Sequence, residues 1–93
     1  MDNLLNFQHK ELAAGRWETL SFAEQMGNIG SEVCRALNWK AKGNVEQTRK
    51  AADRMLELLF LTIRSCKDSA RLKELTRVKE ALTDYFYSDN QYE

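Results

Sequence analysis

Apolar residues recur every three to four positions along most of this chain, and that spacing is typical of amphipathic helices. The pattern separates into three long series, over about 21–42, 44–65 and 69–87, and one shorter series over about 3–14. Because the segments between the long series are short, consecutive helices should run antiparallel. We therefore predict an all-α fold in which residues 1–93 form one domain, an up-and-down antiparallel bundle of three long helices plus a shorter N-terminal helix.

Capping residues mark the expected ends of these helices. Ser21 followed by Glu24 has the spacing of a capping box, in which each side chain bonds the backbone of the other residue. Asn44 with Gln47 repeats that spacing at the start of the next helix. Gly43 lies just before it, where glycine commonly follows a helix end. The sequence therefore predicts a tight turn at Gly43.

The width of the apolar surface differs between the helices. In helix 44–65 it covers more than half of the circumference, so a single neighbouring helix cannot cover it. We expect this helix at the centre of the bundle or shared between two subunits, and helix 69–87, with its narrower stripe, at an edge. The expected core positions, in chain order, are Phe22, Met26, Ile29, Val33, Leu37, Val45, Ala51, Ala52, Met55, Leu56, Leu58, Leu59, Phe60, Thr62, Ile63, Leu72, Leu75, Val78, Leu82, Tyr85 and Phe86.

A strip of small residues lies beside the core stripe of helix 21–42. It contains Ala23, Gly27, Gly30 and Cys34, which share one side of a helix at 100° per residue. Each glycine inside a helix costs roughly 1 kcal/mol relative to alanine, so its presence needs a reason. Either another backbone packs closely along the strip, or the strip is the floor of a pocket for a flat ligand. We favour close packing and predict Gly27, Gly30 and Cys34 as helix-packing or interface residues.

The opposite side of the same helix is polar and contains one tryptophan. Asn28, Glu32, Arg35 and Trp39 share this side and form a candidate partner-binding face. Arg35 precedes Trp39 by four residues and can stack on its ring, and both residue types are enriched at interface hot spots. Alternatively, the first helix or the C-terminal tail covers the Trp39 ring. The sequence leaves both interpretations open.

Antiparallel helices would bring further aromatic residues to the end of the bundle at Gly43. Trp39 and residues 85–87 would meet there, together with the basic residues Lys40, Lys42, Arg49 and Lys50. Aromatic and basic side chains together can bind nucleic acid. Because Asp84 lies at the same end, we favour an aromatic plug with solvated charges. Trp17 is expected to plug the opposite end.

The two cysteines are predicted to remain unpaired. In the antiparallel arrangement Cys34 lies level with about residue 52, roughly 14 residues or 21 Å along the bundle from Cys66. The alpha carbons of a disulfide lie within about 7 Å of each other. We therefore expect both thiols to be small, buried or half-buried apolar groups.

The charge balance argues against a strong general attraction to nucleic acid or membranes. Fourteen basic and fourteen acidic residues give a net charge of zero, which also leaves self-association unopposed. No apolar run approaches the roughly 20 residues of a membrane span, and the first residues lack the pattern of a signal peptide. We expect a cytoplasmic protein without a membrane partner.

Patterns typical of catalytic and metal sites are not found in the sequence. The single histidine, His9, lies in the weakest helix, and neither Cys-x-x-Cys nor Glu-x-x-His pairs occur. No histidine follows an arginine, as HEPN-type helical ribonucleases require, and no glycine-rich loop joins a strand to a helix. Cys34, Cys66 and Ser31 have no histidine base in helical register. The sequence therefore predicts no enzyme activity, catalytic residue, metal ligand or cofactor.

Five distinctive segments are distributed over nearly the whole chain: GRW (15–17), LSFAEQ (20–25), NIGSEVCR (28–35), RMLELLFLTI (54–63) and DYFYSDNQY (84–92). Together they resemble a family of short all-helical proteins of bacteria and archaea, with NIGSEV and DNQY as the more specific elements. The resemblance implies a helical bundle and a prokaryotic origin. Because no activity is known for that family, it implies no cofactor, partner or site residue.

The leading functional hypothesis is a non-enzymatic protein–protein interaction module. We expect it to self-associate as a homodimer, or to bind another helical protein, through helices 21–42 and 44–65. The alternative is a nucleotide- or nucleic-acid-binding module, a HEPN-like bundle without nuclease residues, although nucleic acid is the less expected partner.

Overall fold

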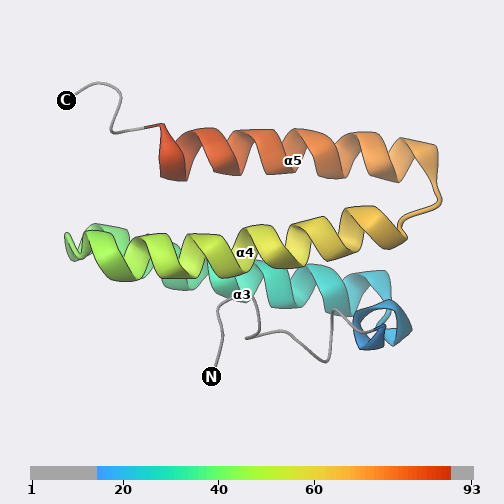
Figure 1. Cartoon of the computed structure of the whole chain (residues 1–93), viewed down its shortest axis with the longest axis horizontal. Helices are drawn as coiled ribbons and strands as arrows, with labels where there is room; N and C mark the ends of the chain where they lie inside the picture. The colour runs from blue at the N-terminus through green and yellow to red at the C-terminus, as the bar shows by residue number, and fades with distance from the viewer. Residues whose placement is uncertain (1–14, 89–93) are drawn as a thin grey trace.

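The computed structural model describes residues 15–88, which form a 3₁₀ turn followed by three long α-helices (Figure 1). The turn η1 spans Arg16–Thr19, and the helices are α3 (Phe22–Ala41), α4 (Val45–Ser65) and α5 (Ser69–Tyr87). The three predicted long helices are confirmed, with bounds that differ by at most one residue. The predicted shorter helix over 3–14 lies outside the described residues. Among the described residues before α3, the structure shows only the turn η1.

Side-chain caps begin each long helix and explain these bounds. The predicted capping box is present, because the Ser21 hydroxyl accepts from Glu24 N at 3.1 Å and the Glu24 carboxylate accepts from Ser21 N at 2.8 Å. Asn44 Oδ1 accepts from the first turn of α4, and Asp68 Oδ1 accepts from two backbone N–H groups of α5. Gly43, at φ +76°, makes the left-handed turn between α3 and α4.

Helix α4 is the centre of the fold, as predicted. Helices α3 and α5 both pack against α4 and barely contact each other, and Figure 1 shows α4 between them. The resulting molecule is flattened, with extents of 39 × 33 × 18 Å. The core that joins the helices includes Ile29, Ala36, Ala51, Ala52, Met55, Leu58, Leu59, Leu75 and Phe86.

Trp17 fixes η1 to the end of the bundle far from Gly43, which confirms its predicted role as a plug. The side chain is 1% exposed, and its indole Nε1 donates to Thr62 Oγ1 at 2.9 Å. The carbonyl of Trp17 accepts from Gln25 Nε2 of α3 at 3.0 Å. The tryptophan thereby connects η1 to both α3 and α4.

The covered surface of each helix is narrower than the sequence predicts. On α3, Ile29 is buried, but Leu37 from the same predicted stripe is 42% exposed. On α4, Val45 and Phe60 are 75% and 57% exposed, and on α5 Val78 and Tyr85 are 37% and 47% exposed. The predicted burial of these five residues is wrong because α3 and α5 each cover only part of α4 and leave a gap between themselves.

Candidate interaction surface

The structure divides the candidate partner-binding face of α3 into a packed part and an exposed part. Glu32 belongs to the packed part: its carboxylate accepts from Arg35 Nη1 at 2.9 Å and from Arg54 Nε of α4 at 3.2 Å. The Glu32 side chain is 12% exposed. Asn28 and Arg35 are exposed, and Asn28 Nδ2 donates to the carbonyl of Glu24. Glu32 therefore joins α3 to α4 instead of lying on a free surface.

Trp39 is half-buried at the end of α3, and its cationic neighbour differs from the expected one. The ammonium group of Lys42 lies 5.2 Å from the Trp39 ring centroid. Arg35, which the sequence places in reach of the ring, instead forms an ion pair with Glu32. The Trp39 ring is therefore contacted by Lys42 at the end of its own helix and not by Arg35.

Tyr87 and Tyr85 join α5 to the other helices at the Gly43 end. The Tyr87 hydroxyl donates to Asp53 Oδ1 of α4 at 2.5 Å, and the Arg49 guanidinium lies 4.8 Å from the ring centroid. Burial raises the pKa of Tyr87, and the hydrogen bond to Asp53 and its negative charge raise it further. Lys40 of α3 lies 5.1 Å from the Tyr85 ring. These contacts confirm the predicted gathering of aromatic and basic residues at this end.

The strip of small residues on α3 has no neighbour within the described part of the chain. Gly27 and Gly30 are exposed, and no atom of another element lies within 4 Å of the position that a Cβ would occupy on either residue. Cys34 is also exposed and free, so its predicted burial is wrong. The strip borders a shallow depression of about 590 Å³. Close packing within residues 15–88 therefore does not explain the glycines, and an interface with another molecule stays a prediction.

An apolar groove separates α3 from α5. We define the α3–α5 groove by its lining residues, Phe22 and Met26 of α3 and Ala70, Arg71, Glu74, Leu75 and Val78 of α5, which enclose about 340 Å³. Val33 and Leu37 follow Met26 by seven and eleven residues, so they continue the same edge of α3 beyond the groove. We call Ala23, Met26, Gly30, Val33 and Leu37 the α3 edge.

Cation–π contacts connect α3 and α5 on either side of this gap. The Arg71 guanidinium lies 4.0 Å from the Phe22 ring centroid beside the groove, and the Lys40–Tyr85 contact lies near the other end of the two helices. Such contacts contribute roughly 0.5–1 kcal/mol each at exposed sites. They therefore link α3 to α5 beside the groove and near the Gly43 end.

Sequence reasoning missed the α3–α5 groove because it expected Leu37 and Val78 to be covered in the same way as Met26 and Val33, which do pack against the core. The sequence nevertheless contains a pattern that indicates a second contact surface on this helix. The α3 edge follows the alternating spacing of three and four residues that is typical of a helix–helix seam. A helix with a second such seam beside its core face is suited to contact two neighbours.

The described residues contain no group of three or more metal-ligating side chains, and none of their helices could span a membrane. Cys66, like Cys34, is free, and His9 lies outside the described residues. No protein-family model, curated protein or solved structure matches the chain. The family resemblance carried by the NIGSEV and DNQY elements stays a prediction.

Proposed function

We propose that this protein is a non-enzymatic interaction module that forms a homodimer through the α3 edge and the α3–α5 groove. The observation that supports this most directly is the uncovered apolar surface in the groove and along the α3 edge. Leu37 and Val78 are 42% and 37% exposed, although both belong to helices that are packed elsewhere. Apolar surface that a small protein leaves uncovered beside an apolar groove is typical of an interaction site.

A helix is the shape that fits this surface. Two helices that pack against a third and meet each other through only a few side-chain contacts leave the fourth position of a four-helix arrangement open. A partner helix in that position would cover Met26 and Val78 and remove their apolar surface from water, at about 25 cal/mol per Å². Gly30 lies on the same α3 edge, where the absence of a side chain lets a second backbone approach closely.

The net charge and the position of η1 favour a second copy of this chain as the molecule that occupies the α3–α5 groove. The net charge of zero means that identical molecules do not repel one another as a whole. In a two-fold dimer the same patch serves both subunits, so one apolar surface is enough. Figure 1 shows η1 on the side of α3 away from α5, so this described turn does not cover the groove.

The oligomeric state tests this proposal. Sedimentation and light scattering over a concentration series should give a dimer mass for the wild type and a monomer mass for Val78→Glu and Gly30→Leu. Because nothing lies within 4 Å of a Cβ on Gly30, a leucine there should not disturb the monomer. Phe60→Glu is the matched control, since it adds the same charge at an exposed apolar site outside the groove, and it should remain dimeric.

Two outcomes would overturn the proposal. A wild-type mass that stays monomeric at all concentrations would exclude self-association and leave another helical protein as the remaining candidate partner. A dimer that is lost only in Phe60→Glu would place the interface on the outer surface of α4.

A second candidate function, binding of a nucleotide or a nucleic-acid end, draws on the aromatic residues near Gly43. Trp39, Tyr85 and Tyr87 each have a cation within 5.2 Å of the ring centroid. Aromatic faces and basic groups together can hold a base and its phosphate. Titration with a short single-stranded RNA should then show binding that weakens with salt and is lost in Trp39→Ala. The absence of salt-dependent binding would eliminate this candidate.

A further inference from the structure

The uncovered surface of α3 is arranged symmetrically about Gly30. Large apolar residues lie on the side toward the α3–α5 groove, and small residues lie on the other side, beside the shallow depression. The large ones are Met26, Val33 and Leu37, and the small ones are Ala23, Gly27 and Cys34. Each large residue is as far from Gly30 along the helix as one small residue is in the opposite direction. At 100° per residue the two are also rotated equally to opposite sides, so Gly30 is the centre of this surface.

A two-fold axis through Gly30 places the two kinds of residue against each other. In an antiparallel pair of α3 helices related by that axis, residues equally far before and after Gly30 face each other. The facing pairs, one residue from each subunit, are Met26 with Cys34, Val33 with Gly27, and Leu37 with Ala23. Every large side chain meets a small residue, so the two helices can approach closely. A parallel pair would instead set each large side chain against its own copy.

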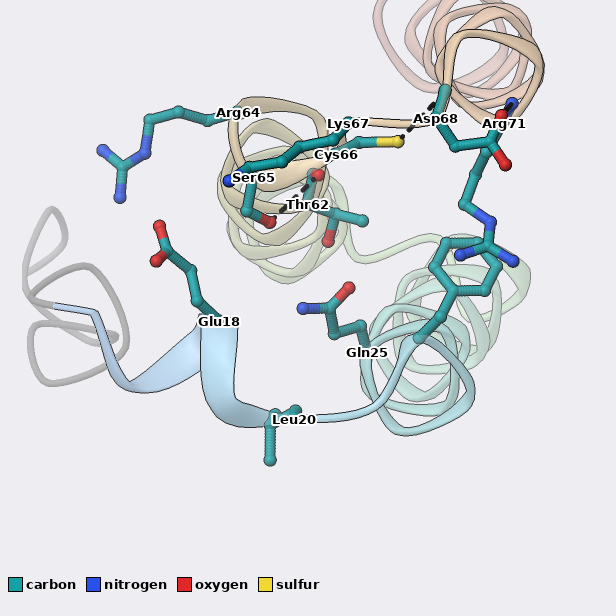
Figure 2. A pocket seen from close by; sticks show the side chains of 11 residues that line it. Glu18, Leu20, Gln25, Thr62, Arg64, Ser65, Cys66, Lys67, Asp68 and Arg71 are labelled. Atoms are coloured by element: carbon teal, nitrogen blue, oxygen red, sulfur yellow. Dashed lines mark hydrogen bonds between the residues drawn. The ribbon is translucent and has the colours of Figure 1, made fainter.

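The charges beside the α3–α5 groove fit the same arrangement. Figure 2, a view of the pocket at the end of the bundle far from Gly43, shows Arg71 reaching from the start of α5 toward α3. One turn further along α5, Glu74 lines the groove together with Met26, so these two residues lie at the same level. The antiparallel pair brings Cys34 of the partner subunit to that level, and with it Arg35, whose side chain is 50% exposed. Glu74 therefore meets a cation there, and such complementary charges fix the register of an interface.

We propose that the element in the α3–α5 groove is helix α3 of the second copy, antiparallel to α3, with the two-fold axis at Gly30. This inference rests on the self-association proposed above and adds the partner element and its register. Helices α3 and α5 run in the same direction (Figure 1). The partner's α3 is therefore antiparallel to both of its neighbours, which is the arrangement of an up-and-down bundle.

Disulfide cross-linking of the full chain tests the register. In a Cys66→Ser background, oxidation of Met26→Cys with diamide should link the new thiol to the native Cys34 of the partner subunit, giving a covalent dimer on a non-reducing gel. The same background without Met26→Cys, or with Met26→Cys and Cys34→Ser together, should stay unlinked. In both controls the only equivalent thiols lie roughly 12 Å apart along the helices, and the alpha carbons of a disulfide lie within about 7 Å.

Sedimentation of the same variants before oxidation separates two kinds of failure. A monomer mass for the wild type would contradict self-association itself. A dimer that is linked through Cys34 alone would show a parallel pair, and a dimer that is linked in none of the variants would show another register. Either of these two results would overturn the antiparallel arrangement and leave self-association standing.

Charge reversal gives a second test that needs no new cysteine. Glu74→Arg should raise the dissociation constant of the dimer at least about tenfold, because two cations then face each other. Adding Arg35→Glu to that variant should recover most of the loss. The matched control is Glu80→Arg, at an exposed position of α5 outside the groove lining, and it should leave the dissociation constant unchanged. The absence of recovery, or an equal loss in Glu80→Arg, would overturn the pairing of Glu74 with Arg35.

Discussion

At the scale of single residues, two hydrogen bonds at opposite ends of the bundle, in addition to the Glu32–Arg54 pair, connect elements that are far apart in the sequence. One is the bond between the Trp17 indole and the Thr62 hydroxyl, which are separated by 45 residues and both buried. The other is the bond between the Tyr87 hydroxyl and Asp53 at the opposite end. Both are directional, so they specify geometry more closely than the apolar contacts around them.

We expect Thr62→Val to destabilise the protein by about 1–3 kcal/mol, because the substitution leaves the buried indole N–H of Trp17 without an acceptor. The matched control is Thr76→Val. Thr76 makes the same bond to a carbonyl four residues earlier, as Thr62 does, but it is exposed. Urea unfolding measures the free energy of unfolding of both variants. An equal loss of stability in the two would show that the bond between Trp17 and Thr62 contributes nothing.

The raised pKa of Tyr87 predicts a loss of stability in alkaline solution. Below the ordinary tyrosine pKa of about 10 the phenol is protonated in both the folded and the unfolded state, so its contribution is fully present. Above that pH the unfolded state releases the proton first, and stability falls. The free energy of unfolding, measured with urea, should therefore fall less steeply above about pH 10 in Tyr87→Phe than in the wild type. The control Tyr85→Phe keeps the Tyr87–Asp53 bond, so its free energy of unfolding should depend on pH as that of the wild type does.

At the scale of elements, α3 combines three different surfaces on one helix. One side packs against α4 through Ile29 and Ala36, a second is the partly exposed α3 edge, and a third contains the uncovered Gly27. Helix propensity alone would disfavour glycine on an exposed side. The two glycines therefore reduce the stability of the monomer, and an interface with another molecule would supply the reason.

Gly30→Ala is expected to stabilise the dissociated monomer by about 0.5–1 kcal/mol, because alanine favours the helix and its Cβ meets nothing within 4 Å. Gly43→Ala should have the opposite effect, since φ at that residue is +76° and a side chain there is strained. Thermal unfolding at low protein concentration measures both. Destabilisation by Gly30→Ala would mean that another part of the chain rests on this position.

The ion pair between α3 and α4 gives a second prediction at this scale. Glu32→Gln should cost about 1.5–3 kcal/mol, because it removes the negative charge that faces the partly buried Arg54. Glu46→Gln is the control: Glu46 pairs with Lys50 at 3.6 Å on the surface of α4, and both side chains are mostly exposed. Chemical unfolding should show no measurable change for that variant, and a similar loss in both would argue against a specific role of Glu32.

At the scale of the whole molecule, the arrangement is asymmetric, with one helix in the middle and two at the sides. Leu58 and Met55 of α4 are buried, whereas much of α5 is exposed and only Leu75 and Phe86 are buried on it. Because α5 packs mainly on α4 and meets α3 through only a few contacts, fewer contacts oppose its detachment.

Amide hydrogen exchange should reveal this asymmetry. In Val78→Glu, which the proposed interface predicts to be monomeric, the central amides of α4 should exchange at the rate set by global unfolding. The amides of α5 should exchange through an opening that requires less free energy, on the order of 1–2 kcal/mol less. In the wild type, the proposed dimer should slow exchange in α5. Uniform protection of α4 and α5 in the monomer would contradict the central role of α4.

Most of the fold could be predicted, whereas most of the candidate surface could not. The capping box at Ser21 and the left-handed turn at Gly43 depend on neighbouring residues, so local sequence is sufficient to place them. The α3–α5 groove depends instead on the distance between two helices that meet through only a few side-chain contacts. Leu37 and Val78 have the spacing of core residues, and only the packing shows that neither is fully covered.

The sequence by itself determined the three long helices, their ends and the central position of α4, because these follow from hydrogen bonds within a few residues and from the width of an apolar stripe. The tertiary structure decided which side of each helix is covered, the meeting of Trp17 with Thr62, the position of Glu32 against Arg54 and the open space above Gly30. The physical reason is that contacts between distant residues depend on the rotation and separation of whole helices. Those quantities result from all of the packing interactions together, and no local pattern contains them.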